Sequence, residues 1–215
     1  GETDACIRLA VGGGLMKDEG STHHPGQERF SKGLSLGLLA MLIVVLVVSF
    51  LRWVADDYWS IQFPYQIDYG EGIVWQQAIM ILRGEGYSDI TQLPFVVFHY
   101  PPVLHLLTGL IAGTLKIEYL AAGRVVAVVS TLGTIIIIGI LIFRAVRTRD
   151  GLISRLLCGL ATGLIVFTFA PIAYWSLLMR VDMLAIFFSY LGIYFGLQAL
   201  EHPRYIYFSV LFFLL

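Results

Sequence analysis

Long apolar runs constrain the fold of this chain more than any other feature of its sequence. A helix needs about 20 mostly apolar residues to cross a hydrocarbon core of about 30 Å. Runs of that length cover residues 33–54, 120–143, 152–173 and 182–200, and a fifth begins near Tyr205. Because helices satisfy their own backbone hydrogen bonds in lipid, this pattern predicts an all-α, polytopic helical membrane protein.

Composition supports the same class of protein. Hydrophobic residues make up 58% of the chain and charged residues 13%, whereas soluble domains average roughly 45–50% and about 25%. The two cysteines, Cys6 and Cys158, lie far apart and provide neither a disulfide framework nor a CxxC metal site. The basic residues are too few to form a nucleic-acid-binding surface, so we expect no nucleic-acid partner.

The distribution of charge predicts which ends of the helices face the cytoplasm. Residues 144–155 contain four arginines and one aspartate, which is typical of a cytoplasmic loop. Residues 55–100 contain six acidic residues and one arginine, so this segment is expected outside. An odd number of crossings must separate the two segments. We therefore expect 120–143 to cross and 101–116, which is shorter and begins with two prolines, to lie on the outer surface.

These assignments give a domain plan. Residues 1–32 form a polar, disordered leader in the cytoplasm, without the apolar core of a cleaved signal peptide. Residues 33–215 form the N-terminal part of a transmembrane domain, which we expect to continue beyond Leu215. A long outer loop, 55–119, carries surface helices between the first two spans. The plan predicts a multi-pass integral membrane protein of the bacterial plasma membrane, with its N-terminus in the cytoplasm.

The outer loop contains the stretch YQIDYGEGIVWQQ, in which Asp68 and Glu71 lie three residues apart. One interpretation is structural: the pair matches a capping box, in which Asp68 caps a helix and Glu71 reaches back to the cap. That helix would end at Gly84 or Gly86, since glycine tolerates the left-handed conformation. The other interpretation is that the two carboxylates are catalytic.

A second polar cluster favours the catalytic interpretation. Arg180 and Asp182 lie at the outer end of a predicted span, on the same side of the membrane as Asp68. An arginine and an aspartate at a span's edge can also be a simple anchor. An arginine can hold a phosphate through two hydrogen bonds, however, and two acidic sites on one face suit chemistry on an anionic lipid-linked substrate.

Three further residues are candidates for substrate binding. His99 and Tyr100 precede the two prolines in FHYPPVLHLL, and we expect His99 and His105 to be interfacial, because their spacing fits no standard metal motif. Arg124 falls near the outer end of its predicted span. It either extends toward the interface or faces a pocket, and the sequence leaves both interpretations open.

Four short motifs in order resemble one family of membrane enzymes. They are DYGEG at 68–72, YPPV at 100–103, AAGR at 121–124 and YWSLLMRVDML at 174–184. Together they are similar to the N-terminal part of GT-C superfamily glycosyltransferases, in the protein O-mannosyltransferase and aminoarabinose transferase-like branch (glycosyltransferase family 39-like). The resemblance covers about residues 33 to 215.

The resemblance implies a function. Such enzymes move a sugar from a polyprenyl-phosphate carrier, dolichyl or undecaprenyl, to a lipid, glycan or protein acceptor outside the cytoplasm. Asp68 matches the catalytic carboxylate of the first outer loop, with Glu71 as its neighbour, and Asp182 with Arg180 matches a second acidic motif. Several relatives have adjacent Asp and Glu, whereas Tyr69 and Gly70 intervene here, so Asp68, Glu71 or both could act on the acceptor.

The chemistry of the reaction assigns roles to these residues. Asp68 is expected to be the base, Glu71 to orient it or the acceptor, and Arg180 to hold the lipid phosphate. A divalent metal, Mg²⁺ or Mn²⁺, between Asp68 and Asp182 is compatible with carboxylate and phosphate ligands. The sequence does not decide whether the site needs one. The alternative functions are a multi-span transporter or lipid flippase and a non-catalytic membrane scaffold.

Overall fold

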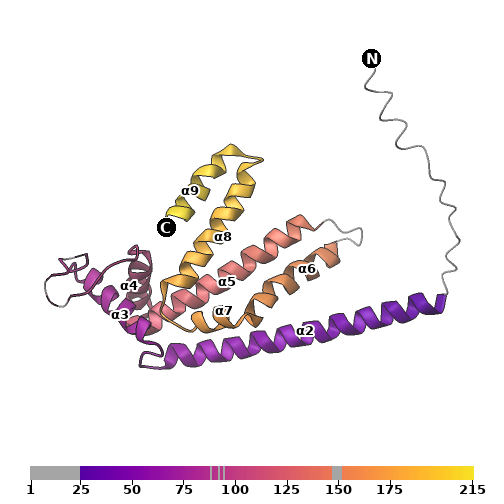
Figure 1. Ribbon diagram of the computed structural model, residues 1–215, viewed down its shortest axis with the longest axis horizontal. Helices are drawn as coiled ribbons and strands as arrows, with labels where there is room; N and C mark the ends of the chain where they lie inside the picture. Colours follow the sequence, from indigo (N-terminus) through magenta and orange to yellow (C-terminus); the bar gives the residue numbers. More distant parts are fainter. Residues whose placement is uncertain (1–24, 88, 92, 94, 147–151) are drawn as a thin grey trace, which may run out of the picture. The chain divides into compact units, whose positions relative to one another are not determined.

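The structure, a computed structural model, describes residues 25–87, 89–91, 93, 95–146 and 152–215. Every regular element in these ranges is a helix, which confirms the all-α prediction (Figure 1). The chain divides into two units, residues 1–41 and residues 42–215. The described part of the first unit, residues 25–41, is helical throughout, and all remaining elements belong to the second unit.

The first helix, α2, is longer than the sequence predicts. It runs from Pro25 to Gln62 and therefore contains the predicted span 33–54. Residues 25–32, predicted to be disordered, are its first turns, because proline suits the first turn of a helix; residues 1–24 lie outside the described part of the chain. At the other end α2 continues into the predicted outer loop and ends just before Pro64, since the residue before a proline avoids the α conformation.

Helix α3, Tyr69–Leu82, confirms the helix predicted in the outer loop. Asp68 is its N-cap, with extended backbone, and its Oδ2 accepts a hydrogen bond from the Gly70 amide at 2.9 Å. Arg83 is the C-cap, and Gly84 follows with φ of 76°. This left-handed residue ends the helix where the sequence predicted, because glycine adopts positive φ without steric cost.

Helix α4, Val103–Leu115, follows the two prolines in the segment that was predicted to lie on the outer surface. Pro102 is its N-cap, and Lys116 at its end has a left-handed backbone with φ of 55°. At 13 residues, or about 20 Å, it is too short to cross a hydrocarbon core. One face of the helix is buried (Leu104, His105, Thr108 and Ala112).

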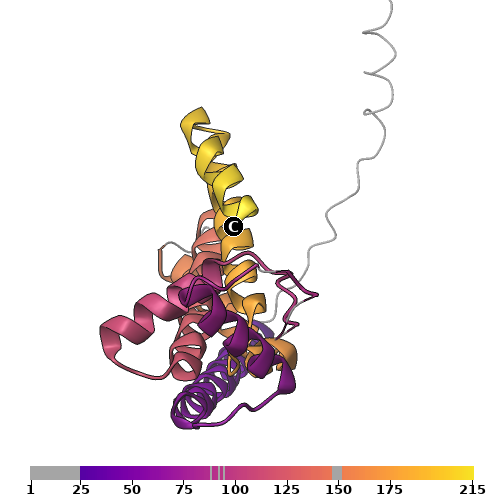
Figure 2. The same ribbon diagram turned by 90° about the vertical axis from the view of Figure 1, so that its left-hand side faces the viewer.

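Two helices of the described chain are long and apolar enough to cross a membrane: α5, Tyr119–Ala145, and α8, Val181–Ala199. They match the predicted runs 120–143 and 182–200. Helix α5 packs against α4, α6 and α8, and α3 and α4 lie at its N-terminal end, which faces the viewer in Figure 2. The core of this end combines side chains from α3, α4, α5 and the start of α8.

The run 152–173, predicted as one span, is divided into three pieces. Helix α6 covers only Leu152–Ile165, a 3₁₀ turn η1 covers Val166–Thr168, and a short helix α7 covers Ala170–Trp175. Pro171 explains the division, because it has no N–H to continue the ladder of α6 and fits only the first turn of a new helix. A single continuous helix over 152–173 is therefore incorrect.

After α8 the chain turns through η2, Pro203–Tyr205, into α9, Ile206–Leu214, which packs back on α8. The Ser209 hydroxyl donates to the carbonyl of Gly192 at 2.8 Å. Residues 147–151 of the predicted arginine-rich loop, 144–155, lie outside the described residues. Arg155, at the end of this loop, donates two hydrogen bonds to the Phe143 carbonyl, at 3.1 and 2.9 Å.

Candidate functional site

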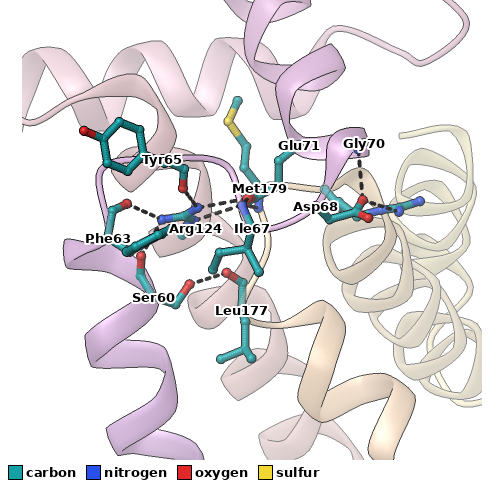
Figure 3. Close-up of polar contacts among 11 residues, drawn as sticks. Ser60, Phe63, Tyr65, Ile67, Asp68, Gly70, Glu71, Arg124, Leu177 and Met179 are labelled. Atoms are coloured by element: carbon teal, nitrogen blue, oxygen red, sulfur yellow. Dashed lines mark hydrogen bonds and ion pairs between the residues drawn. The ribbon is translucent and has the colours of Figure 1, made fainter.

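A fully buried arginine organises the end of the bundle where α2, α3, α5 and α8 meet. Arg124, near the start of α5, has no exposed surface, so of the two expectations for this residue it does not extend to the interface. A guanidinium has five N–H donors, and all five are used here (Figure 3). Three of them go to backbone carbonyls at the end of α2 and just after it (Ser60, Phe63 and Tyr65).

The other two donors of Arg124 go to Glu71, which is equally buried. Arg124 Nε lies 2.9 Å from Oε1 and Nη2 lies 2.9 Å from Oε2. Each carboxylate oxygen accepts a second hydrogen bond from a backbone amide: Oε1 from Met179 and Oε2 from Ile67, both at 2.7 Å. Burial alone would raise the pKa of Glu71, but the hydrogen bonds from Arg124 and the two amides outweigh it, so the pKa is lowered.

The capping-box interpretation is thus confirmed in part. Asp68 caps α3 as predicted, but the Glu71 carboxylate binds the amide of Ile67 rather than that of the cap residue itself. Its second amide partner, Met179, is distant in sequence and precedes α8. One buried carboxylate therefore binds both the backbone before α3 and the backbone before α8, and fixes their relative positions.

Asp68 and Arg180, which follow Ile67 and Met179 in the chain, belong to a partly exposed ionic cluster. Arg180 Nη1 lies 3.5 Å from Asp68 Oδ2. Arg180 Nε donates to Asp182 Oδ2 at 2.9 Å. The Asp68 side chain is 23% exposed and that of Arg180 30% exposed, so a ligand can reach both.

Arg180 keeps its charge firmly in this cluster. Partial burial would lower its pKa, but the hydrogen bond to Asp182 and the nearby Asp182, Asp68 and Tyr100 side chains outweigh burial and raise the pKa. Its Nη2 has no hydrogen-bond partner among the described residues. The cluster therefore presents a permanent cation with a free donor next to a carboxylate.

The structure divides the predicted site residues into three groups. Asp68, Arg180 and Asp182 come together, with Tyr100 close enough to affect Arg180. Glu71 and Arg124 form the buried pair beneath them. His99 is exposed and its ring contacts that of Tyr100, with centroids 3.9 Å apart and the planes tilted by 50°.

His105, expected at the interface, is buried instead. Only 1% of it is exposed, and its Nε2 lies 3.4 Å from Gln77 Oε1. Burial lowers the pKa of His105 below its usual range. The reason for the difference is its position on the buried face of α4, together with Leu104 and Thr108.

Two cavities border α3. The first, of about 730 Å³, is lined by residues 61–66, by Gly72 and Trp75 of α3, and by residues around the start of α5. The second, of about 610 Å³, shares Gly72 and Trp75 with it and reaches His99. Both are large enough for a small ligand, but neither is lined by Asp68, Arg180 or Asp182.

The two predicted metal ligands, Asp68 and Asp182, belong to the cluster around Arg180. Among the residues that the structure describes, no group of three or more His, Cys, Asp or Glu side chains could hold an ion. Asp68 and Asp182 both contact Arg180. A divalent ion at these two carboxylates stays a prediction from the sequence.

Sequence reasoning missed the partners of the buried pair. Ser60, Phe63 and Tyr65 act through backbone carbonyls and Met179 through its amide, and such roles leave no side-chain signal. A signal did exist for Glu71. It shares the i, i+3, i+7 spacing of a buried helix face with Val74 and Ala78, both of which are buried.

No family model, no curated protein and no solved structure matches the chain.

Proposed function

We propose that this chain belongs to a membrane glycosyltransferase that moves a sugar from a polyprenyl-phosphate donor to an acceptor on the extracytoplasmic side. The observation that carries the proposal is the contact of Asp68 with Arg180 at a partly exposed position. A carboxylate that can take a proton lies directly beside a cation that can hold a phosphate. The donor would be a lipid of the bacterial plasma membrane, and the acceptor a lipid, glycan or protein.

A membrane location supports a lipid-linked substrate. Helices α5 and α8 are long and apolar enough to cross a bilayer, and many large apolar side chains of α2, α6 and α9 are exposed. Such surfaces are unusual in soluble proteins and suit contact with lipid. We propose a multi-pass arrangement with the Asp68–Arg180 cluster at the outer surface and the N-terminus in the cytoplasm.

The proposed reaction is a single displacement at the anomeric carbon. Asp68 accepts the proton of the acceptor's hydroxyl or amine as that group attacks the carbon. The bond from this carbon to the phosphate oxygen breaks, and its electron pair leaves with the polyprenyl phosphate. Because one carboxylate acts and no covalent sugar intermediate forms, the configuration at this carbon inverts.

Arg180 is the proposed phosphate-binding residue. Negative charge builds on the phosphate oxygen as the sugar leaves, and a fixed cation with a free N–H donor stabilises that charge. Asp182 holds Nε of the same guanidinium at 2.9 Å. It therefore orients Arg180 so that Nη2 is directed to the substrate.

Glu71 and Arg124 are proposed to position these groups rather than to react. Glu71 has no exposed surface and all its acceptor positions are occupied. It can act on the substrate only through the backbone of Ile67 and Met179. This role matches the expectation that Glu71 orients Asp68.

The sugar-transfer steps described above use side chains of this protein and no metal ion. Mg²⁺ or Mn²⁺ at Asp68 and Asp182 would have to replace Arg180 as the partner of both carboxylates and add phosphate oxygens as ligands. Dependence on a divalent ion therefore stays a prediction from the sequence. Addition of EDTA to the transfer assay tests it.

The test uses the full chain, purified in detergent and supplied with a panel of undecaprenyl-phosphate and dolichyl-phosphate sugars. Release of free polyprenyl phosphate measures turnover, and retention of labelled donor measures binding. Asp68→Asn should lower turnover by about 10²–10⁴-fold, the usual contribution of a general base, while donor binding persists.

The control is Glu85→Gln, an exposed carboxyl in the same segment, which should leave turnover unchanged. Full turnover by Asp68→Asn would contradict the proposed role of Asp68. Donor-independent translocation of a lipid, with no release of phosphate by the wild type, would instead support the transporter or flippase alternative. A scaffold would show neither activity.

A further inference from the structure

A buried carboxyl without a partner lies one helical turn away from the Arg124 contacts. Asp57, on α2 after the predicted span, is only 3% exposed, and neither of its oxygens has a hydrogen-bond partner within the described chain. A buried carboxylate without a donor is costly. None of the roles assigned above uses Asp57.

Asp57 lies on the face of α2 that holds the turn before α8. Trp53 Nε1 donates to the Ser176 hydroxyl at 2.7 Å, and the Ser60 hydroxyl donates to the Leu177 carbonyl. Trp53, Asp57 and Ser60 are spaced as one helical face, and all three are buried. The turn they hold continues into Met179 and Arg180.

The hydrogen bonds of Ser176 limit how well its hydroxyl can stabilise the charged form of Asp57. The hydroxyl has one proton and two lone pairs. Its proton goes to the Ala173 carbonyl at 2.9 Å, and one lone pair accepts from Trp53. The hydroxyl proton is therefore already engaged, and neither oxygen of Asp57 makes a hydrogen bond within the described chain, so Ser176 compensates a charge on Asp57 only weakly.

The charged groups around Asp57 also disfavour its ionisation. Asp56 is adjacent on α2 and is itself paired with Arg52 at 3.7 Å. The segment 167–177 contacts α2 through Phe167, Ser176 and Leu177. It contains no charged residue and only Tyr174 as a titratable side chain. On α5 the nearby charge is Arg124, which is fully paired with Glu71. Burial, followed by the charge of Asp56, raises the pKa of Asp57 to about 7, and Ser176 opposes this rise.

We propose that Asp57 is a positioning residue controlled by protonation: its neutral form docks the turn 176–180 on α2 and thereby places Arg180. Loss of the proton leaves a buried carboxylate without a hydrogen-bond donor among the described residues, and the turn loosens. The docking itself is independent of the proposed function, whereas its effect on sugar transfer rests on that function.

The pH window follows from the pKa of the two states. In the docked state the pKa of Asp57 is about 7, whereas an undocked, hydrated Asp57 returns to its ordinary value of 3.8. A carboxyl whose pKa is raised in the docked state stabilises that state fully below the pKa of the undocked state. This stabilisation is lost as the pH rises to the pKa of the docked state. The docking equilibrium should fall about tenfold per pH unit between about 4 and about 7, and then level off.

The experiment is hydrogen–deuterium exchange of the full chain in detergent, followed in peptides that cover residues 174–180, from pH 5 to pH 8. At each pH, Asp57→Asn is the reference, which cancels the intrinsic pH dependence of exchange. Relative to this variant, wild-type protection should fall about tenfold per unit from pH 5 to pH 7. Asp56→Asn, which removes the exposed carboxyl adjacent to Asp57, should keep the fall in protection with pH. The fall should end at a lower pH than in the wild type, because the charge of Asp56 no longer raises the pKa of Asp57.

Equal pH profiles for the wild type and Asp57→Asn would overturn the proposal. Asp57→Leu, neutral and of similar size, replaces Asp57→Asn if the latter does not fold. Failure of both neutral variants to fold would show that the charged form is required, which also overturns it. The exchange measurement needs no substrate, so its outcome is separate from that of the transfer assay.

Discussion

The Glu71–Arg124 pair shows how a buried ion pair can be tolerated. Removing two charges from water costs several kcal/mol per ion and is offset only when geometry is good and the remaining donors and acceptors are satisfied. Here all five donors of Arg124 and two acceptor positions on each oxygen of Glu71 are occupied. The pair is therefore specific to this arrangement of α2, α3, α5 and the turn before α8.

Loss of one partner should destabilise the protein strongly. Glu71→Gln leaves the Arg124 charge buried and unpaired, and we expect a loss of about 3–5 kcal/mol in the free energy of unfolding. Denaturant unfolding in detergent measures it, with exposed Glu85→Gln as the control. A loss as small as the control's would contradict the structural role of the pair.

The pH dependence of the same variant gives an independent check. The pKa of Glu71 is lowered from 4.5 in the folded state, so its contribution is present above that value and is lost as pH falls through the folded pKa. The stability difference between the wild type and Glu71→Gln should therefore shrink on acidification below about pH 4.5. A difference that grows with acidity would contradict this assignment.

Among the helices, α5 and α6 approach each other through glycines. A Cβ atom at Gly159 of α6 would lie 2.7 Å from the carbonyl oxygen of Gly139 on α5, and one at Gly163 would lie 3.1 Å from that of Ile135. A backbone carbonyl cannot rotate away as a flexible side chain can. These two helices can pack this closely because glycines, which have no side chain, lie at the contact between them.

Adding one methyl group at this contact should separate α5 from α6. Gly159→Ala is expected to lower the stability of the protein by about 1–3 kcal/mol, the usual cost of overpacking. Gly113→Ala is the matched control, because a Cβ there meets nothing within 4 Å, and alanine should stabilise α4 by about 0.8–1 kcal/mol. Thermal unfolding of both variants measures the difference. Equal effects would contradict the close contact.

The helices that could be predicted are those with a long apolar run or with residues that mark a helix end. Helices α5 and α8 follow from apolar length, and α3 and α4 from the Asp68 cap, Gly84 and the two prolines. The ends of α2 and α6 were placed incorrectly because hydropathy was used as the boundary. The actual boundaries lie near Pro64 and Pro171, which act on backbone geometry rather than on polarity.

The candidate site was predictable where it depends on topology and unpredictable where it depends on packing. Charge distribution placed Asp68 and Arg180 on one side, and the structure brings them within 3.5 Å. The pairing of Glu71 with Arg124 and the burial of Asp57 depend on how α2, α3 and α5 pack. Such contacts between distant segments leave no periodic signal in a single sequence.

At the scale of the whole second unit, charge segregates along the helices. Helices α5 and α8 both begin near the Glu71–Arg124 pair, and at their other ends Arg144 lies over the ring of Tyr194, 5.4 Å from its centroid. Arg155 lies at this same end, through its bonds to Phe143. Arg144 and Arg155 thus share the end of α5 that lies opposite the acidic cluster. That this end faces the cytoplasm stays a prediction from the sequence.

The most direct test of the account is the side of the membrane on which the Asp68–Arg180 site lies. The native cysteines are first replaced by Cys6→Ser and Cys158→Ser, and one new cysteine is then introduced per variant. Tyr69→Cys reports on the start of α3, Tyr174→Cys on the segment before α8, and His202→Cys on the end of α8. In intact cells, a membrane-impermeant thiol reagent should label Tyr69→Cys and Tyr174→Cys, and should label His202→Cys only after permeabilisation. Labelling of Tyr69→Cys and Tyr174→Cys from opposite sides would contradict a single outer site.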